Sequence, residues 1–181
     1  TEVLTGTNSL LLLNKRTIQT LPLMVLSVVF YSFSNQNKFL QPRWNETPVV
    51  AVMLFLCSLI SVFNGRYCCY LVKARVTKKE SGGYFSLRIP SLIIYEIFFR
   101  AVLLGIFLQL FAKPVAIALN VALYGLAHGF GSRKEFVGSF PFGVLLCFIT
   151  ILSQSVYPAV LLHLSLALPY ESILFIKSRT N

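Results

Sequence analysis

The chain has 181 residues, of which 56% are apolar and only 12% are charged. An average soluble domain carries about twice that charged fraction, so the composition predicts an integral membrane protein with the lipid bilayer as a partner. The 16 Lys and Arg residues outnumber the 6 acidic residues, but they lie between apolar runs. We therefore attribute them to membrane topology and expect no nucleic-acid partner. Every acidic residue is Glu, which excludes an aspartyl dyad, an Asp-based Mg²⁺ cluster and an EF-hand.

Six apolar runs are candidate membrane spans, since a spanning helix needs about 20 mostly apolar residues. They lie at 18–33, 48–65, 89–111, 114–130, 137–153 and 156–176. The first run is the weakest, because Pro22 and a Ser- and Tyr-rich end shorten it. The pattern predicts an all-α, polytopic membrane helix bundle with about six transmembrane helices.

One long polar stretch, at 73–88, separates the second and third runs. Its Gly82-Gly83 pair favours a loop or a short interfacial helix. We divide the chain into an N-terminal region (1–84) with two transmembrane helices and a basic loop, a transmembrane core (85–176) and a basic tail (177–181). The chain begins at Thr1 rather than Met, which indicates a processed or truncated product.

The basic residues predict the orientation in the membrane. If the loops are assigned alternately to two sides, the side of both termini collects 12 basic residues and the other side 3. The positive-inside rule therefore places both termini on the cytoplasmic, matrix or stromal side. This suits an organelle inner membrane, the endoplasmic reticulum or a bacterial inner membrane.

Four ionisable residues inside the apolar runs are candidates for chemistry, because such residues are costly in hydrocarbon. They are Glu96, Arg100, His128 and His163. Glu96 and Arg100 are four residues apart, so they share a helix face and can pair. That pair can fix helix packing, or it can hold a carboxylate for proton or metal chemistry. One carboxylate and two imidazoles suit a catalytic zinc, a carboxylate-activated water or a proton relay, and spacing alone does not choose between them.

Three segments resemble the motifs of one known family. They are YEIFFR at 95–100, YGLAH at 124–128 and HLSLA at 163–167. They are similar to the motifs Glu-Glu-x-x-x-Arg, Phe-x-x-x-His and His-x-x-x-Asn of the CAAX prenyl protease and bacteriocin-processing (CPBP, or Abi) family of intramembrane proteases. The resemblance extends over residues 85–170 and implies a CPBP-like helix bundle.

The resemblance also implies roles for the matching residues. In that family the leading Glu of the first motif and the His of the second activate a water, and the His and Asn of the third help to form the site. The matching residues are Glu96 as the second Glu, Arg100 as its partner, and His128 and His163 as the two histidines. We expect these side chains to gather around one pocket in the membrane, which requires the polar turn at 153–155 to dip into the bilayer.

Two departures from the motifs affect the chemistry directly. Tyr95 occupies the position of the leading Glu, and Ala167 occupies the position of the Asn. A phenol, with an ordinary pKa of about 10, cannot replace a carboxylate as general base at neutral pH. Losing one oxyanion donor lowers the rate by about 10²–10³. Together these losses predict little remaining proteolysis.

Three functions are compatible with these residues. The first, which we favour, is a homologue that has lost proteolysis and serves as a structural or binding subunit, with other membrane-protein subunits as partners. The second is an active intramembrane endopeptidase in which Glu96, His128 and His163 suffice, with zinc as cofactor if the site is metal-dependent. The third is a small transporter or proton-relay protein.

Overall fold

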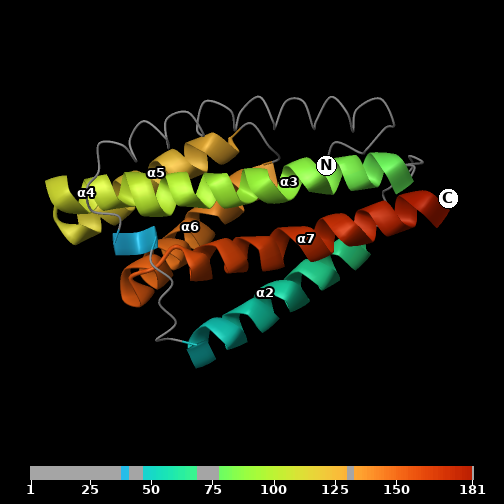
Figure 1. Cartoon of the computed structure of the whole chain (residues 1–181), viewed down its shortest axis with the longest axis horizontal. Helices are drawn as coiled ribbons and strands as arrows, with labels where there is room; N and C mark the ends of the chain where they lie inside the picture. Colours follow the sequence, from blue (N-terminus) through green and yellow to red (C-terminus); the bar gives the residue numbers. More distant parts are fainter. Residues whose placement is uncertain (1–37, 41–46, 69–77, 130–132, 181) are drawn as a thin grey trace. The chain divides into compact units, whose positions relative to one another are not determined.

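The computed structural model describes the chain except for residues 1–37, 41–46, 69–77, 130–132 and 181 (Figure 1). Every regular element in the described part is a helix, which confirms the predicted fold class for these residues. The helices are η1 (Lys38–Leu40), α2 (Thr47–Cys68), α3 (Lys78–Glu96), η3 (Ile97–Leu103), α4 (Leu104–Leu110), α5 (Lys113–His128), α6 (Arg133–Ser153) and α7 (Tyr157–Thr180).

Four helical stretches among the described residues are long and apolar enough to cross a membrane. They are Pro48–Tyr67, Gly82–Leu110, Glu135–Ser153 and Tyr157–Lys177, and they agree with four of the predicted runs. Helix α5 agrees with the run at 114–130, but its 16 residues extend only about 24 Å, less than the roughly 30 Å of a bilayer core. The run at 18–33 lies outside the described residues, so a total of six spans stays a prediction.

The prediction of a loop or a short interfacial helix at the glycine pair is wrong. Helix α3 continues through residues 82–83 as part of a longer helix. Glycine costs about 1 kcal/mol relative to alanine in a helix interior. This cost is offset by packing immediately downstream, where the ring of Tyr84 contacts that of Phe175 at a centroid distance of 4.8 Å.

The chain forms two compact units. The first contains α2, α3 as far as Ile93, and α7 from Leu161 onward; the second contains η1 and the segment Ile94–Val160. Residues Glu96, Arg100 and His128 therefore belong to the second unit. The division of the chain at residues 84 and 176 is a different partition, based on sequence, and stays a prediction.

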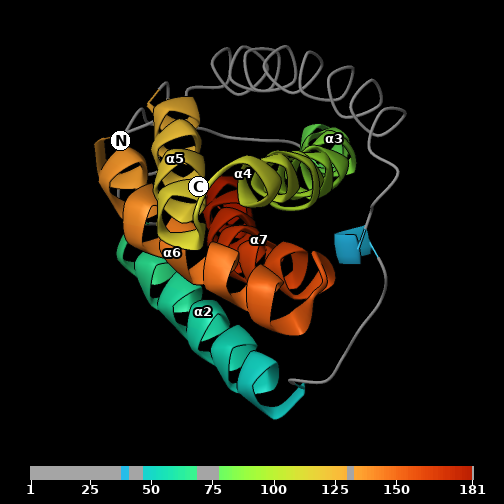
Figure 2. The ribbon, with the colours of Figure 1, turned by 90° about the vertical axis from the view of Figure 1, so that its left-hand side faces the viewer.

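In the second unit, α5 and α6 pack along each other as an antiparallel pair (Figure 2). Glycines at the contact allow the close approach. A Cβ atom at Gly125 would lie 2.7 Å from the ring of Phe140, and one at Gly143 would lie 3.1 Å from the ring of Tyr124. The absence of these two Cβ atoms brings the polar residues of α5 within reach of α6.

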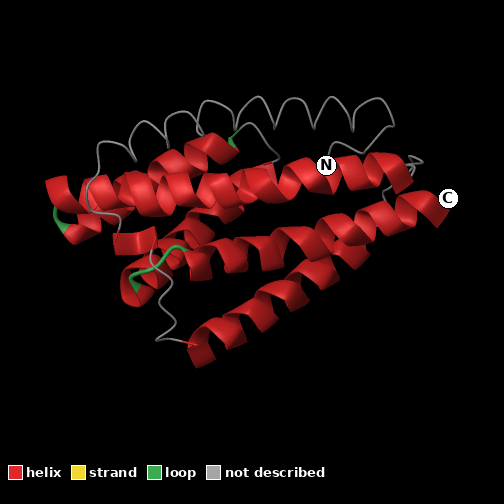
Figure 3. Cartoon of the chain, in the orientation of Figure 1, coloured by secondary structure: helices red, strands yellow, loops and turns green. Residues whose placement is uncertain are grey.

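Helices α6 and α7 are joined by a short turn, drawn green in Figure 3, whose two serines are buried. Ser153 and Ser155 are buried, and the Ser153 hydroxyl donates to the carbonyl of Ser155 at 3.0 Å. Gln154 between them has a positive φ of 51°, a conformation that few residues other than glycine adopt. The N–H of Val156 donates to the carbonyl of Phe39 in η1 at 2.7 Å. A turn with its polar groups satisfied in this way is what the predicted dip into the bilayer requires.

In the first unit, α2 and α7 lie side by side (Figure 1). Ser61 of α2 accepts a hydrogen bond from the backbone N–H of Tyr170 at 2.8 Å. This N–H follows Pro169 in the helix, and a proline disturbs the hydrogen-bond ladder around it. One turn further along α2, a Cβ atom at Gly65 would lie 3.0 Å from Ile173. Small α2 side chains thus set the spacing of the two helices.

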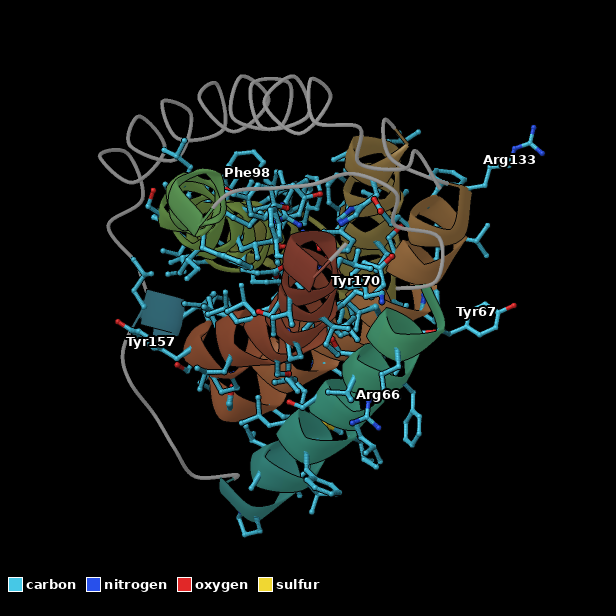
Figure 4. The ribbon with its side chains drawn as sticks, turned by 90° about the vertical axis from the view of Figure 1, so that its right-hand side faces the viewer. Arg66, Tyr67, Phe98, Arg133, Tyr157 and Tyr170 are labelled. Atoms are coloured by element: carbon cyan, nitrogen blue, oxygen red, sulfur yellow. The ribbon has the colours of Figure 1, made fainter. Side chains whose placement is uncertain are left out.

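Helix α3 joins the same unit through an ion pair with α7 and through the ring contact of Tyr84 with Phe175. Arg88 Nε lies 2.9 Å from Glu171 Oε1 on α7, and both side chains are mostly buried. At the end of α2, Arg66 and Tyr67 are exposed, and Tyr67 projects away from the helix (Figure 4). Exposed Tyr and basic residues at a helix end are typical of the membrane–water boundary.

Candidate functional site

The long helix that starts with α3 changes its geometry where the first motif lies. Residues Ile97–Leu103 form a π-helix, η3, between two α-helical segments. The N–H of Leu104 bonds to the carbonyl of Phe99, five residues earlier. Such π segments are rare and frequently occur at functional sites. Arg100 lies in the middle of this segment and is fully buried.

The predicted ion pair between Glu96 and Arg100 is present. Arg100 Nε donates to Glu96 Oε2 at 3.1 Å, and both side chains are fully buried. The hydroxyl of Tyr124 donates to the other carboxylate oxygen, Oε1, at 3.3 Å. The guanidinium carbon of Arg100 also lies 4.4 Å from the centroid of the Tyr124 ring, a cation–π distance. Both carboxylate oxygens therefore accept hydrogen bonds from protein donors.

Two further residues complete the surroundings of the guanidinium. Nη1 of Arg100 donates to Asn120 Oδ1 on α5 and to Cys147 Sγ on α6, the latter at 3.1 Å. Nη2 is buried with no hydrogen-bond partner among the described residues. Neither Asn120 nor Cys147 was among the candidate residues predicted from the sequence. Asn120 had one signal in the sequence, which is its amide within an apolar run. In addition, Asn120, Tyr124 and His128 are spaced at four-residue intervals and so share one helix face.

The residue at the leading Glu position lies against the histidine of the second motif. The hydroxyl of Tyr95 is 3.0 Å from Nδ1 of His128. The same Nδ1 is 2.9 Å from the carbonyl oxygen of Tyr124. A carbonyl can only accept, so the contact with the Tyr124 carbonyl assigns a proton to Nδ1. The first two motifs thus converge, with a phenol in contact with the imidazole.

The third motif belongs to the other compact unit. His163 and Ala167 lie on α7, and His163 is buried. Convergence of His163 with Glu96 and His128 stays a prediction. The described residues contain no group of three or more His, Cys, Asp or Glu side chains placed to hold a metal ion.

Comparison with known families identifies the segment that contains this site. Residues 85–168 match the family model of Type II CAAX prenyl endopeptidase Rce1-like proteins. This segment is therefore similar to the CAAX prenyl endopeptidase family. The resemblance inferred from the three motifs is thereby confirmed. Comparisons with the curated proteins and with the solved structures find no significant match.

The family match and the four apolar helices together indicate an integral membrane protein. The matched segment includes the three stretches that resemble the motifs, in which Tyr95 and Ala167 are the two residues expected from the sequence to depart from the pattern. Of these two, Tyr95 has a described partner in the site, His128.

Proposed function

We propose that this chain is a CAAX endopeptidase homologue that has lost proteolysis and serves as a structural or binding subunit of a membrane complex. The observation that carries the proposal is the 3.0 Å contact between the Tyr95 hydroxyl and His128 Nδ1. In the family pattern a carboxylate stands at that position next to the motif histidine. Here a phenol takes its place and engages the imidazole.

The neighbouring carboxylate does not compensate for this loss. Glu96 is fully buried and accepts from Arg100 and Tyr124. To act as general base it would have to give up one of these bonds and reach a water molecule. Breaking a buried ion pair leaves an uncompensated charge, which costs about 3–5 kcal/mol. The burial of this carboxylate and the hydrogen bonds to both of its oxygens therefore support a packing role for Glu96.

A second function has one observation in its favour. Glu96 and His128 both bond to Tyr124, the carboxylate through the hydroxyl and the imidazole through the carbonyl. A carboxylate and an imidazole that are both hydrogen-bonded to the same residue could together activate a water molecule. An active endopeptidase built on Glu96, His128 and His163 is therefore the alternative. It requires that the unmodified chain cleaves a prenylated or transmembrane peptide and that Glu96→Gln abolishes the cleavage.

The experiment compares chains reconstituted in liposomes with a prenylated CAAX peptide. The wild-type chain is expected to release no product. The double substitution Tyr95→Glu with Ala167→Asn restores the two missing groups, and we expect it to cleave the peptide. The matched control is Tyr95→Gln with Ala167→Asn, which has nearly the same shape without the carboxylate and should stay inactive. Cleavage by the wild-type chain would contradict the proposal.

The subunit role has a separate test. We expect the affinity-purified chain to carry membrane-protein partners in stoichiometric amounts. Because packing and not catalysis holds them, His128→Ala should leave the partners in place. Elution of the wild-type chain alone from mild detergent and from lipid nanodiscs would contradict this role.

We further infer that both termini lie on the cytoplasmic, matrix or stromal side. The support is the distribution of the basic residues, 12 against 3 between the two sides. Single cysteines at Ser178 and at Gln36 should be labelled from opposite sides of sealed vesicles by a membrane-impermeant maleimide, in a background with the native cysteines replaced. Labelling of both from the same side would contradict the topology.

A further inference from the structure

The buried amide of Asn120 connects three elements of the second unit. Its Nδ2 donates to the carbonyl of Phe99 at 2.7 Å. Its Oδ1 accepts from Arg100 Nη1 and, at 3.3 Å, from Cys147 Sγ. These neighbours fix the amide orientation, because a guanidinium can only donate and a carbonyl can only accept. One α5 side chain thus holds two consecutive residues of η3, one by its backbone and one by its side chain.

The carbonyl that Asn120 holds is one of those that define the π geometry. The Phe99 carbonyl accepts the N–H of Leu104, five residues later, whereas in an α-helix it would accept that of residue 103. A carbonyl has two lone pairs, and Asn120 supplies a donor for the second. Because π turns are rare and α geometry is the usual alternative, a second hydrogen bond at this oxygen favours the wide turn.

The wide turn also sets the direction of the residues that precede it. A π turn accommodates one extra residue, so a return to α geometry would rotate these residues by about 100° relative to α4. Tyr95 lies one turn before Phe99, and the two rings are in contact at a centroid distance of 4.7 Å. Such a rotation would carry the Tyr95 hydroxyl away from His128.

We propose that Asn120 is a positioning residue. By binding Phe99 and Arg100 together it holds η3 in π geometry, and it thereby keeps Tyr95 against His128. The proposal goes beyond the function proposed above and does not depend on it, because it concerns the geometry of the site and holds whether or not the chain cleaves peptides.

Two substitutions separate the hydrogen bond of Asn120 to the Phe99 carbonyl from its hydrogen bond to Arg100. Asn120→Leu has a similar volume and removes both hydrogen bonds. Asn120→Asp keeps an acceptor for Arg100 but removes the donor to the Phe99 carbonyl. The matched control is Thr150→Val in α6, because Thr150 is equally buried and its hydroxyl bonds only within its own helix, to Leu146 at 2.8 Å.

The measurements are amide hydrogen exchange over residues 97–104 and the ¹⁵N ring signals of histidine, on the full chain in lipid nanodiscs. The chain has 2 histidines, so the signal of His163 serves as an internal reference. Losing the hydrogen bond to Phe99 is expected to raise exchange over 97–104 by about five- to tenfold in both Asn120 variants. The His128 signals should shift in both, and Thr150→Val should leave both readouts unchanged.

The aspartate variant decides the outcome even if the leucine variant does not fold. Faster exchange over 97–104 together with a shifted His128 signal in Asn120→Asp supports the proposal. If Asn120→Asp matches the wild-type chain in either readout, the hydrogen bond from Asn120 to the Phe99 carbonyl does not hold the π turn, and the proposal is overturned. The same conclusion follows if Thr150→Val raises exchange as much as the Asn120 variants do.

Discussion

Replacing Arg100 by Leu removes one partner of an ion pair in which both side chains are fully buried. The Glu96 carboxylate then loses its ionic partner and keeps the hydrogen bond from the Tyr124 hydroxyl at 3.3 Å. Removing one partner of a buried pair costs about 3–5 kcal/mol, because the other charge stays buried without compensation. For a chain of this length that corresponds to a fall in the unfolding midpoint of about 6–20 °C.

The second variant tests the reason for this loss. In the double substitution Glu96→Gln with Arg100→Leu no charge is left uncompensated, so the double variant should unfold at a higher temperature than Arg100→Leu alone. The assay is thermal unfolding in lipid nanodiscs followed by circular dichroism. Glu96→Gln alone should cost less than Arg100→Leu, because Arg100 keeps its contacts with Asn120 and Cys147. If the double variant is less stable than both single variants, the buried charge is not the source of the loss.

Two further predictions concern helix packing, with unfolding temperature as the measurement. Gly125→Leu places atoms inside the van der Waals radius of the Phe140 ring and should lower the stability by about 1–3 kcal/mol. The control is Gly138→Ala, because a Cβ atom at Gly138 would meet nothing within 4 Å; this variant should leave the stability unchanged or raise it by up to about 1 kcal/mol. Equal stability of the two variants would refute the packing argument. Ser61→Ala removes the acceptor of the Tyr170 N–H and should cost about 1 kcal/mol, so an unchanged midpoint would show that this bond adds no net stability.

Only part of the candidate site could be predicted from the sequence. The contact that could be predicted joins residues close together in the chain, and the contact that could not be predicted joins residues far apart. The pair of Glu96 and Arg100 is local, since the two residues are four apart on one helix and helical geometry brings them together wherever the helix packs. The contact of Tyr95 with His128 joins residues that are 33 apart. Motif order indicated that these two positions belong to one site, but the hydrogen bond between them depends on how α5 packs against the π-helical segment.

The remaining contacts of the site gave no comparable signal in sequence. The residues that bind Arg100 besides Glu96 lie 20 and 47 positions away, and one of them, Cys147, lies within an apolar run that gives no sign of a polar contact. The π geometry of η3 was equally inaccessible, because the segment IFFRAVL has no proline, glycine or other residue that would mark a change of helix type. We attribute it to a side chain on a different helix.

The sequence by itself indicated that the chain is a helical membrane protein, that Glu96 and Arg100 can pair on one helix, and that residues 85–170 carry an endopeptidase-like order of motifs. These properties follow from local composition and from the cost of charge in hydrocarbon, which act on each segment separately. Only the tertiary structure decided that a phenol engages the motif histidine and that an amide on α5 meets both Phe99 and Arg100. Such contacts depend on the relative rotation of packed helices, which local sequence does not encode.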